Sequence, residues 1–434
     1  GAGMPKISKR NGTTLIGGLF ALAGCMVGPD YEAPEVTVSD EFRSRLEQRV
    51  SGEIVAASEA QIPESTGPNF ALLTWEQVFV DPLLSSLIAT ALQNNLELVA
   101  VRARVESAEA ILAQTRSSLL PQLSVPFVFE DRAENAIGGR NAGDFRYQLS
   151  GALAWEVDFF GFNRRRVEFA RANVLAARHR LHLTHISLIR RLATAYFELL
   201  DVSARAAITE QTIETRLRAL QILRLRRESG IISGLAVRQA EVALAEAEAA
   251  LPGFLRLRLD LENAIRVLTG NIPDSLGRIS QLAGEVSLFI DVPESLPTGL
   301  PSQLLRRRPD ILIAEANLKA ATAMIGVAQA DFFPRLALTG ERGLRSDDLD
   351  SFLRSGVDAW RVSTTLTQPV YQGGRLRGAL REAEAARDEA LARYQQVILV
   401  ALSEVSAALQ GYGQAESLVE INKRRRDSAR SYLD

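Results

Sequence analysis

The sequence predicts a mainly α-helical protein built from two copies of one unit, each with a β-hairpin that suits a membrane. Three observations carry this prediction. Long stretches follow the 3–4 spacing of helices, two segments match each other at a constant offset, and each segment contains strands in which apolar and polar side chains alternate. With 434 residues, of which 47% are hydrophobic, the chain is long enough to bury a core.

The N-terminal residues predict a targeting signal and a lipid anchor. Residues 1–24 join a basic start to an apolar run that is too short to span a bilayer, as in a signal peptide. The run ends in Leu-Ala-Gly-Cys, which resembles a bacterial lipobox, and on that resemblance Cys25 becomes the acylated first residue of a lipid-anchored segment, residues 25–81. The alternative is an ordinary secretory signal with an incidental cysteine. No later stretch predicts a membrane helix, so any further crossing would need strands.

The matching segments define two repeats, residues 82–270 and 303–434, joined by a linker rich in proline and glycine at residues 271–302. The offset that places Pro121 on Pro334 also places Gly161 on Gly374. Because the first repeat turns at Gly230, the equivalent turn of the second would lie beyond the last residue. We therefore expect the second repeat to lack its turn and its last helix.

Each repeat predicts a helix, a strand, a loop, a strand and a long helix. The first helix, residues 82–120, has two apolar seams about 120° apart, which favours a neighbour on each side, as in a curved wall of helices. The alternative is the core of a multi-helix bundle. Pro121 and Pro334 are expected to end helices where strands begin.

Residues 145–159 alternate apolar and polar side chains, and a second alternation surrounds Trp360. We expect membrane-interface aromatics on the apolar face and exposed loops at residues 131–144 and 342–357. The alternative is a hairpin half-buried in a soluble sheet. Four strands cannot close a barrel, and open edges are not tolerated in lipid, so strands that face lipid would require several copies of the chain. The expected interface aromatics are Tyr147, Trp155, Phe159 and Trp360.

Tight bends from strand to helix are expected at Gly161 and at Gly373-Gly374. The helix after Gly161 is predicted to run to about residue 229, which is about 100 Å of helix if unbroken. It would turn at Gly230-Ile231-Ile232-Ser233 and return through a helix that Pro252 breaks or kinks.

The remaining clusters offer weaker signals. His179, His182 and His185 are the only histidines, and we favour packing or lumen lining over a metal site, since positions six apart diverge on one helix. Arginines after the two bends, at residues 164–166 and 375–381, would meet lipid phosphates or would only be solvated helix starts. Neither a catalytic constellation nor a nucleotide-binding motif is present, no cofactor or metal is expected, and the net charge of −2 gives no reason to expect nucleic acid.

Several motifs resemble one family. They are residues 25–34 (CMVGPDYEAP), the pattern of Trp75, Phe79, Asp81 and Pro82, the segment 299–310 (GLPSQLLRRRPD), and residues 371–375 (YQGGR). Together these resemble TolC-like outer-membrane efflux proteins of the OprM/NodT type. The resemblance implies a homotrimer with a 12-stranded β-barrel in the outer membrane and a periplasmic α-barrel.

The resemblance also implies a function: passive conduction of drugs or other small molecules delivered by an inner-membrane RND-type transporter. A periplasmic adaptor protein would dock at the tip, residues 230–233, although the alternative there is a turn without a partner. Two other functions stay open at this stage. The chain would otherwise be the outer channel of a type I protein secretion system, or a periplasmic coiled-coil adaptor lipoprotein without strands in lipid.

Overall fold

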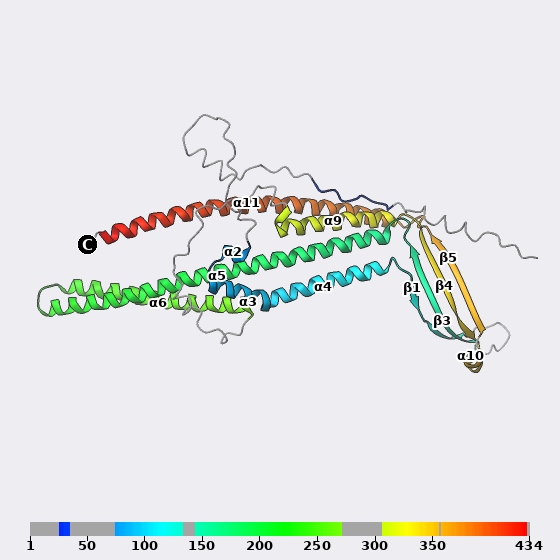
Figure 1. Cartoon of the computed structure of the whole chain (residues 1–434), viewed down its shortest axis with the longest axis horizontal. Helices are drawn as coiled ribbons and strands as arrows, with labels where there is room; N and C mark the ends of the chain where they lie inside the picture. Colours follow the sequence, from blue (N-terminus) through cyan, green and yellow to red (C-terminus); the bar gives the residue numbers. More distant parts are fainter. Residues whose placement is uncertain (1–25, 35–73, 133–143, 271–305, 356, 432–434) are drawn as a thin grey trace, which may run out of the picture. The chain divides into compact units, whose positions relative to one another are not determined.

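The computed structural model describes residues 26–34, 74–132, 144–270, 306–355 and 357–431 (Figure 1). The chain divides into two compact units, each containing segments of both repeats. The first unit comprises Gly1–Thr37, Val105–Arg178 and Asp310–Glu404, and the second comprises Val38–Arg104, His179–Pro309 and Val405–Asp434. The signal peptide, Cys25 and the linker lie outside the described residues.

Long helices dominate the described chain, and a group of strands interrupts each repeat once (Figure 1). The helices are α2 (Trp75–Val78), α3 (Pro82–Asn94), α4 (Leu96–Ser117), α5 (Phe162–Glu228), α6 (Gly234–Thr269), α9 (Pro309–Ala330), α10 (Leu349–Ser355) and α11 (Arg375–Ser431). The strands are β1 (Gln122–Ser124), β2 (Phe127–Arg132), β3 (Asp144–Val157), β4 (Arg335–Ser346) and β5 (Val357–Thr367).

The element boundaries confirm two structural repeats. Helices α4 and α9 are both 22 residues long, and their first residues, Leu96 and Pro309, are related by the same offset as Pro121 and Pro334. The same offset relates the starts of β1 and β4 and the starts of α5 and α11. The repeat that the sequence predicts is therefore a repeat of helix, strand and helix in three dimensions.

The strands form one antiparallel sheet in the first unit, in the order β1-β3-β4-β5, with β2 also paired to β3. Strands β1 and β2 lie along the same partner and are separated at Val125-Pro126. The central pairing places Trp155 opposite Leu338, and Leu338 opposite Thr364. Strand β5 on one side and β1 and β2 on the other have no neighbour within the described sheet.

The predicted helix at residues 82–120 is wrong in one respect, because it is interrupted at Asn95. Asn95 leaves the helical conformation with ψ of 122°. Its side-chain oxygen accepts a hydrogen bond from the Leu98 N–H at 3.1 Å, and its amide donates to the Leu268 carbonyl oxygen at 2.9 Å. Asn95 thus starts α4 as an N-cap and ties that start to the end of α6.

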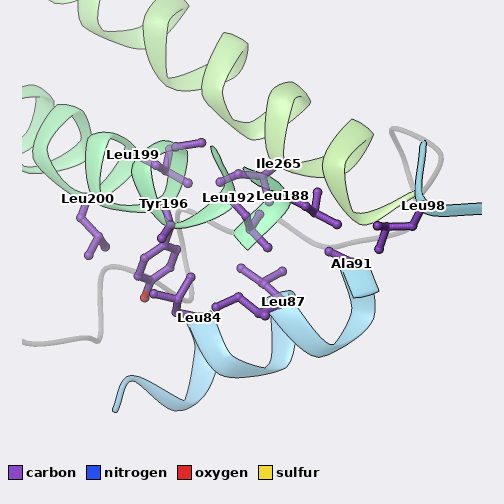
Figure 2. Close-up of a cluster of buried hydrophobic side chains, with 13 residues drawn as sticks. Leu84, Leu87, Ala91, Leu98, Leu188, Leu192, Tyr196, Leu199, Leu200 and Ile265 are labelled. Atoms are coloured by element: carbon purple, nitrogen blue, oxygen red, sulfur yellow. The ribbon is translucent and has the colours of Figure 1, made fainter. Parts of the chain in front are cut away.

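The core of the second unit forms where α3 packs against α5 and α6 (Figure 2). Leu84 and Leu192 are fully buried there, and Tyr196 donates a hydrogen bond to the Asp81 carboxylate at 2.7 Å. Asp81 also caps α3 by accepting from the Leu83 N–H at 2.8 Å, with Pro82 at the first helical position. Burial, together with the Asp81 carboxylate, raises the pKa of the Tyr196 hydroxyl.

Two further expectations are corrected. Pro252 lies inside α6, which continues from Gly234 to Thr269, so the expected break is wrong, while the alternative of a kink stays a prediction. The predicted loop at residues 342–357 is shorter, because β4 extends to Ser346 and the short helix α10 follows it. A helix start at Leu349 follows from Asp348, whose carboxylate accepts from the Ser351 N–H at 2.9 Å.

One described helix does meet the length and composition of a membrane span, contrary to the sequence-based expectation. This helix is α9, and most of its apolar window is buried within the protein. Its buried residues include Ile311, Leu318 and Ile325. A core helix meets the same criterion, so α9 by itself is weak evidence for a membrane helix.

Candidate functional site

The sheet presents one apolar face that is largely exposed. On this face Trp360 has 75% of its surface exposed and Leu123 also 75%, unusual values for large apolar side chains. Alternation places most of the large apolar residues of the five strands on the same side of the sheet, with Val128 and Val357 as exceptions. Its exposed members include Leu123, Phe127, Phe129, Leu149, Leu153, Leu344, Trp360, Val362 and Leu366. Apart from the ion pair of Arg342 with Asp358, this face is largely apolar, and an apolar surface of this extent needs a partner other than water.

The expected interface aromatics do not share one environment. Tyr147 lies near the loops, with its ring 5.2 Å from Phe129 and 6.1 Å from Phe352 of α10. Trp155 lies toward the helices and donates its indole N–H to the Leu119 carbonyl oxygen at 3.1 Å. Phe159 is half-buried and lies beyond the end of β3, while Trp360 lies on β5.

The opposite face of the sheet is polar. Gln148 and Ser150 of β3 and Glu341 of β4 lie on it, and the Ser150 hydroxyl donates to the Glu341 carboxylate at 2.7 Å. Gln148 donates to the same carboxylate oxygen. One apolar and one hydrogen-bonded polar face on the same strands is the pattern of a barrel wall between lipid and water.

The strand-to-helix turns lie where the sequence places them. Gly161 has φ of 85° between β3 and α5, and Gly373 and Gly374 have φ of 58° and 88° before α11. Pro121 directly precedes β1, and Pro334 directly precedes β4. Positive φ is the conformation that favours glycine, so these bends depend on it.

A short N-terminal strap, residues 26–34, packs against the first turn. The Val27 N–H donates to the Phe160 carbonyl oxygen at 3.1 Å. Arg165, whose side chain is 3% exposed, donates to the carbonyl oxygens of Val27 at 3.0 Å and Gly28 at 2.8 Å, and pairs with Asp30 at 3.0 Å. The strap starts one residue after Cys25, which lies outside the described residues.

The far end of the strap crosses α9. The Tyr31 hydroxyl donates to the Glu315 carboxylate at 3.3 Å, and the Lys319 ammonium lies 4.9 Å from the Tyr31 ring centre. Burial, with the nearby Glu315 charge, raises the pKa of Tyr31. Sequence reasoning did not find these contacts, because the strap and α9 are distant in the chain.

Two of the three arginines after the first bend, Arg164 and Arg165, have partners within the chain. Arg164 pairs with Asp158 at 3.4 Å and donates to its backbone oxygen at 3.0 Å, and Arg165 holds the strap. Arg375, after the second bend, bonds to Gln372 at 2.8 Å. Arg377 and Arg381 are exposed.

The helical tip is a hairpin between α5 and α6, with Gly230 at φ of 74°. Ile231 points outward and is 71% exposed, whereas Ile232 packs against Leu220 and Val237. Ser233 directly precedes α6 as its N-cap residue. The hairpin has an apolar seam of its own and an exposed apolar tip.

Behind the tip, Glu241 joins the two helices. It accepts from Arg224 of α5 at 3.0 Å and from Arg238 of α6 at 3.0 Å. The bond from Arg224 is the main cause that lowers the pKa of Glu241, even though the carboxylate is exposed.

The histidines follow one another along α5. The rings of His179 and His182 are 6.4 Å apart and nearly perpendicular. Among the described residues, no group of three histidine, cysteine, aspartate or glutamate side chains is arranged to hold a metal ion. Partial burial lowers the pKa of His185, and the neighbouring charges of Arg102 and His182 add to this.

Comparisons with known proteins agree with this geometry. The sequence profile described as "Outer membrane efflux protein" matches residues 87–271 and 300–434. The antibiotic efflux pump outer membrane protein ArpC of Pseudomonas putida is 31% identical over 401 residues, which cover 90% of this chain and 78% of that protein. OprJ, an outer membrane protein of Pseudomonas aeruginosa, is also 31% identical over the same shares of the two chains.

Solved structures share the fold. The outer-membrane channel OprN superimposes with a TM-score of 0.79 at 30% identity, covering 92% of this chain and 86% of that one. The channel CusC superimposes with a TM-score of 0.75 at 25% identity, covering 92% and 86%. In both cases a channel shares the arrangement of long helices and one sheet described above.

Proposed function

This chain belongs to the outer membrane efflux protein family, and from that premise we propose that three copies form the channel through which a tripartite pump exports small molecules. Family members are channel proteins of the outer membrane that serve efflux pumps. The observation that carries the proposal is the sheet with one exposed apolar face, one polar face and two edges that pair with no other described strand.

Closure of the barrel requires several copies. Unpaired N–H and C=O groups at an edge in hydrocarbon each cost several kcal/mol, about 2–7 by transfer measurements, so β5 of one copy must pair with β1 and β2 of another. Three copies would contribute about twelve strands if β1 and β2 count as one, a number within the range of bacterial barrels. The apolar face would then contact outer-membrane lipid, and the polar face would line the lumen.

We propose that the tip, residues 230–233, docks a periplasmic adaptor protein, which connects the channel to an inner-membrane RND-type transporter. Two features support docking. A β-carbon added at Gly230 would meet no atom within 4 Å among the residues that the structure describes, and Ile231 is exposed beside it. Small residues allow close approach of a partner helix, and an exposed apolar side chain can be buried there.

We propose also that Cys25 carries a covalent lipid. The strap supports this because it fixes residue 26 against the turn that ends β3, where the sheet meets the helices. An acyl chain on the preceding residue would then enter the membrane beside the barrel. Mass spectrometry of the mature protein tests this directly, and an unmodified Cys25 thiol would contradict it.

Reconstitution in planar bilayers tests the main proposal. The purified protein should form discrete conductance steps, most readily in the presence of its adaptor. Co-purification separates the two transport roles: an RND-type transporter with its adaptor supports efflux, whereas a secretion ATPase would support the type I secretion role. Absence of any conductance with and without partners would contradict a channel.

A further inference from the structure

A hollow lies on the polar face of the sheet, where three strands place small residues side by side. Ser150 of β3 pairs with Gly343 of β4, which pairs with Ala359 of β5. At Gly343 a β-carbon would overlap the Leu149 carbonyl oxygen, so the close approach of β3 requires glycine. The row of small side chains leaves a cavity of about 70 Å³.

Two arginines border this hollow on opposite sides. Arg345 is two residues from Gly343 along β4, and Arg361 is two residues from Ala359 along β5. Side chains two residues apart in a strand point to the same face, so both guanidinium groups lie on the polar face. The pair of Gly343 and Ala359, which forms the hollow, lies between them.

Neither arginine is neutralised by an ion pair within the part of the chain that the structure describes. Other arginines of these strands are paired: Arg146 with Glu130 at 3.3 Å, and Arg342 with Asp358 at 3.0 Å. Arg345 and Arg361 have no carboxylate oxygen within 4.0 Å among the described residues.

The position of the Glu341 side chain explains why it does not neutralise the positive charge of Arg361. By register it is the direct cross-strand partner of Arg361. Its carboxylate is instead held on the β3 side, where Ser150 donates at 2.7 Å and Gln148 donates to the same oxygen. Among the described residues that line the hollow, Glu341 carries the only acidic side chain, and that side chain is thus engaged away from β5.

We propose that this hollow binds the anionic groups of conducted molecules (carboxylates, sulfonates or phosphates) and that it biases the channel toward anions. Guanidinium groups bind such oxyanions through paired hydrogen bonds. A cavity of about 70 Å³ has room for a small anionic group rather than for a whole drug molecule. The inference rests on the proposed function, because only a closed barrel turns the polar face toward a water-filled lumen.

The test is ion selectivity in planar bilayers, measured from reversal potentials in a KCl gradient. The double variant Arg345→Gln with Arg361→Gln should lower the ratio of chloride to potassium permeability roughly threefold at low salt. The change should shrink at about 1 M salt, where the Debye length falls to about 3 Å. Inorganic phosphate should block wild-type current at concentrations that leave the double variant unaffected.

Three matched variants sharpen the test. Glu341→Gln removes the negative charge of the hollow and should raise the ratio. Arg342→Gln removes a paired arginine from the opposite face of β4 and should leave the ratio unchanged. Arg361→Gln alone changes an exposed side chain, so it should fold and should give part of the effect.

The outcomes separate this inference from the proposed function. If wild type and the folded double or single variants conduct with equal permeability ratios and equal phosphate block, the inference is overturned while the channel stands. If wild type does not conduct in any condition, the channel itself fails and the inference fails with it.

Discussion

The two strand-to-helix turns occupy equivalent places in the two repeats, and within the described parts of the chain only the first is covered by another segment. A β-carbon at Gly161 would lie 2.5 Å from the Met26 side chain and 3.2 Å from its Cα. At Gly373 and Gly374 it would meet no atom of the described residues within 4 Å. All three glycines have positive φ, so both turns favour glycine for their backbone conformation. At the first turn a side chain would also clash with Met26.

The strap that causes this difference is held by Arg165, which has no counterpart in the second repeat. The offset between the repeats places Arg165 on Gly378, where an added β-carbon would meet no described atom within 4 Å. The first repeat therefore carries a buried arginine where the second carries no side chain. The two repeats share one sequence pattern but differ in the role of the turn. The turn of the first repeat holds the strap, whereas the turn of the second holds no described segment.

The largest expected effect comes from Arg165→Gln. Loss of the guanidinium leaves the Val27 and Gly28 carbonyl oxygens without their donors and should lower the free energy of unfolding by about 3 kcal/mol. The strap should also detach, so chymotrypsin should cleave at Tyr31. The control Arg377→Gln changes an exposed arginine of the second repeat and should alter neither property.

A smaller effect distinguishes the turns themselves. Gly161→Ala should cost about 2 kcal/mol, because positive φ and contact with the strap both oppose a β-carbon. Gly374→Ala should cost about 1 kcal/mol, for the backbone conformation alone. Urea unfolding in detergent measures both, and equal losses would mean that the strap does not press on the first turn.

The helix starts of the two repeats give the third test. Helix α4 starts after a capping Asn95, whereas α9 starts with Pro309. Asn95→Ala should cost about 1 kcal/mol, since it removes the N-cap and the bond to the Leu268 carbonyl oxygen. The exposed neighbour Asn94→Ala is the control, and an equal loss in both variants would exclude a capping role.

The smallest effect is a pH dependence confined to the first repeat, where His185 stands at the position of Ile398 in the second. Its pKa lies below the ordinary value of 6.5, mainly through burial, so the unfolded chain binds the proton first. Stability should therefore be full above pH 6.5 and should fall as the pH drops below that value. His185→Gln should flatten this slope, and a slope that persists would place the titrating group elsewhere.

The strands and the equivalent helix starts could be predicted from the sequence, because both show as patterns in the order of residues. Alternation around Trp155 and Trp360 predicts the strands, and the constant offset predicts that α5 and α11 start at equivalent residues. Both signals can be read from the order of residues alone, without knowledge of which distant segments come into contact. The helix break at Asn95 was missed, although Pro309, which the offset places on the next residue, Leu96, was a signal for it.

Features that depend on distant partners could not be predicted. Arg165 is one of three consecutive arginines, and nothing in the sequence distinguishes the buried one from its neighbours. The charge of Arg361 is likewise plain in the sequence, but the engagement of Glu341 by β3 depends on a pairing between the two repeats. Pro252 shows the converse, since a strong local breaker is accommodated inside a long helix.

The pairing of sheet edges between copies of the chain is the feature on which the proposed channel depends most. Native mass spectrometry of the detergent-solubilised protein tests it directly, because the number of copies follows from the mass. We predict a particle of three chains that requires detergent to stay in solution. A single chain that remains soluble without detergent would mean that the exposed apolar face and the open edges are covered within one copy, and it would contradict the channel.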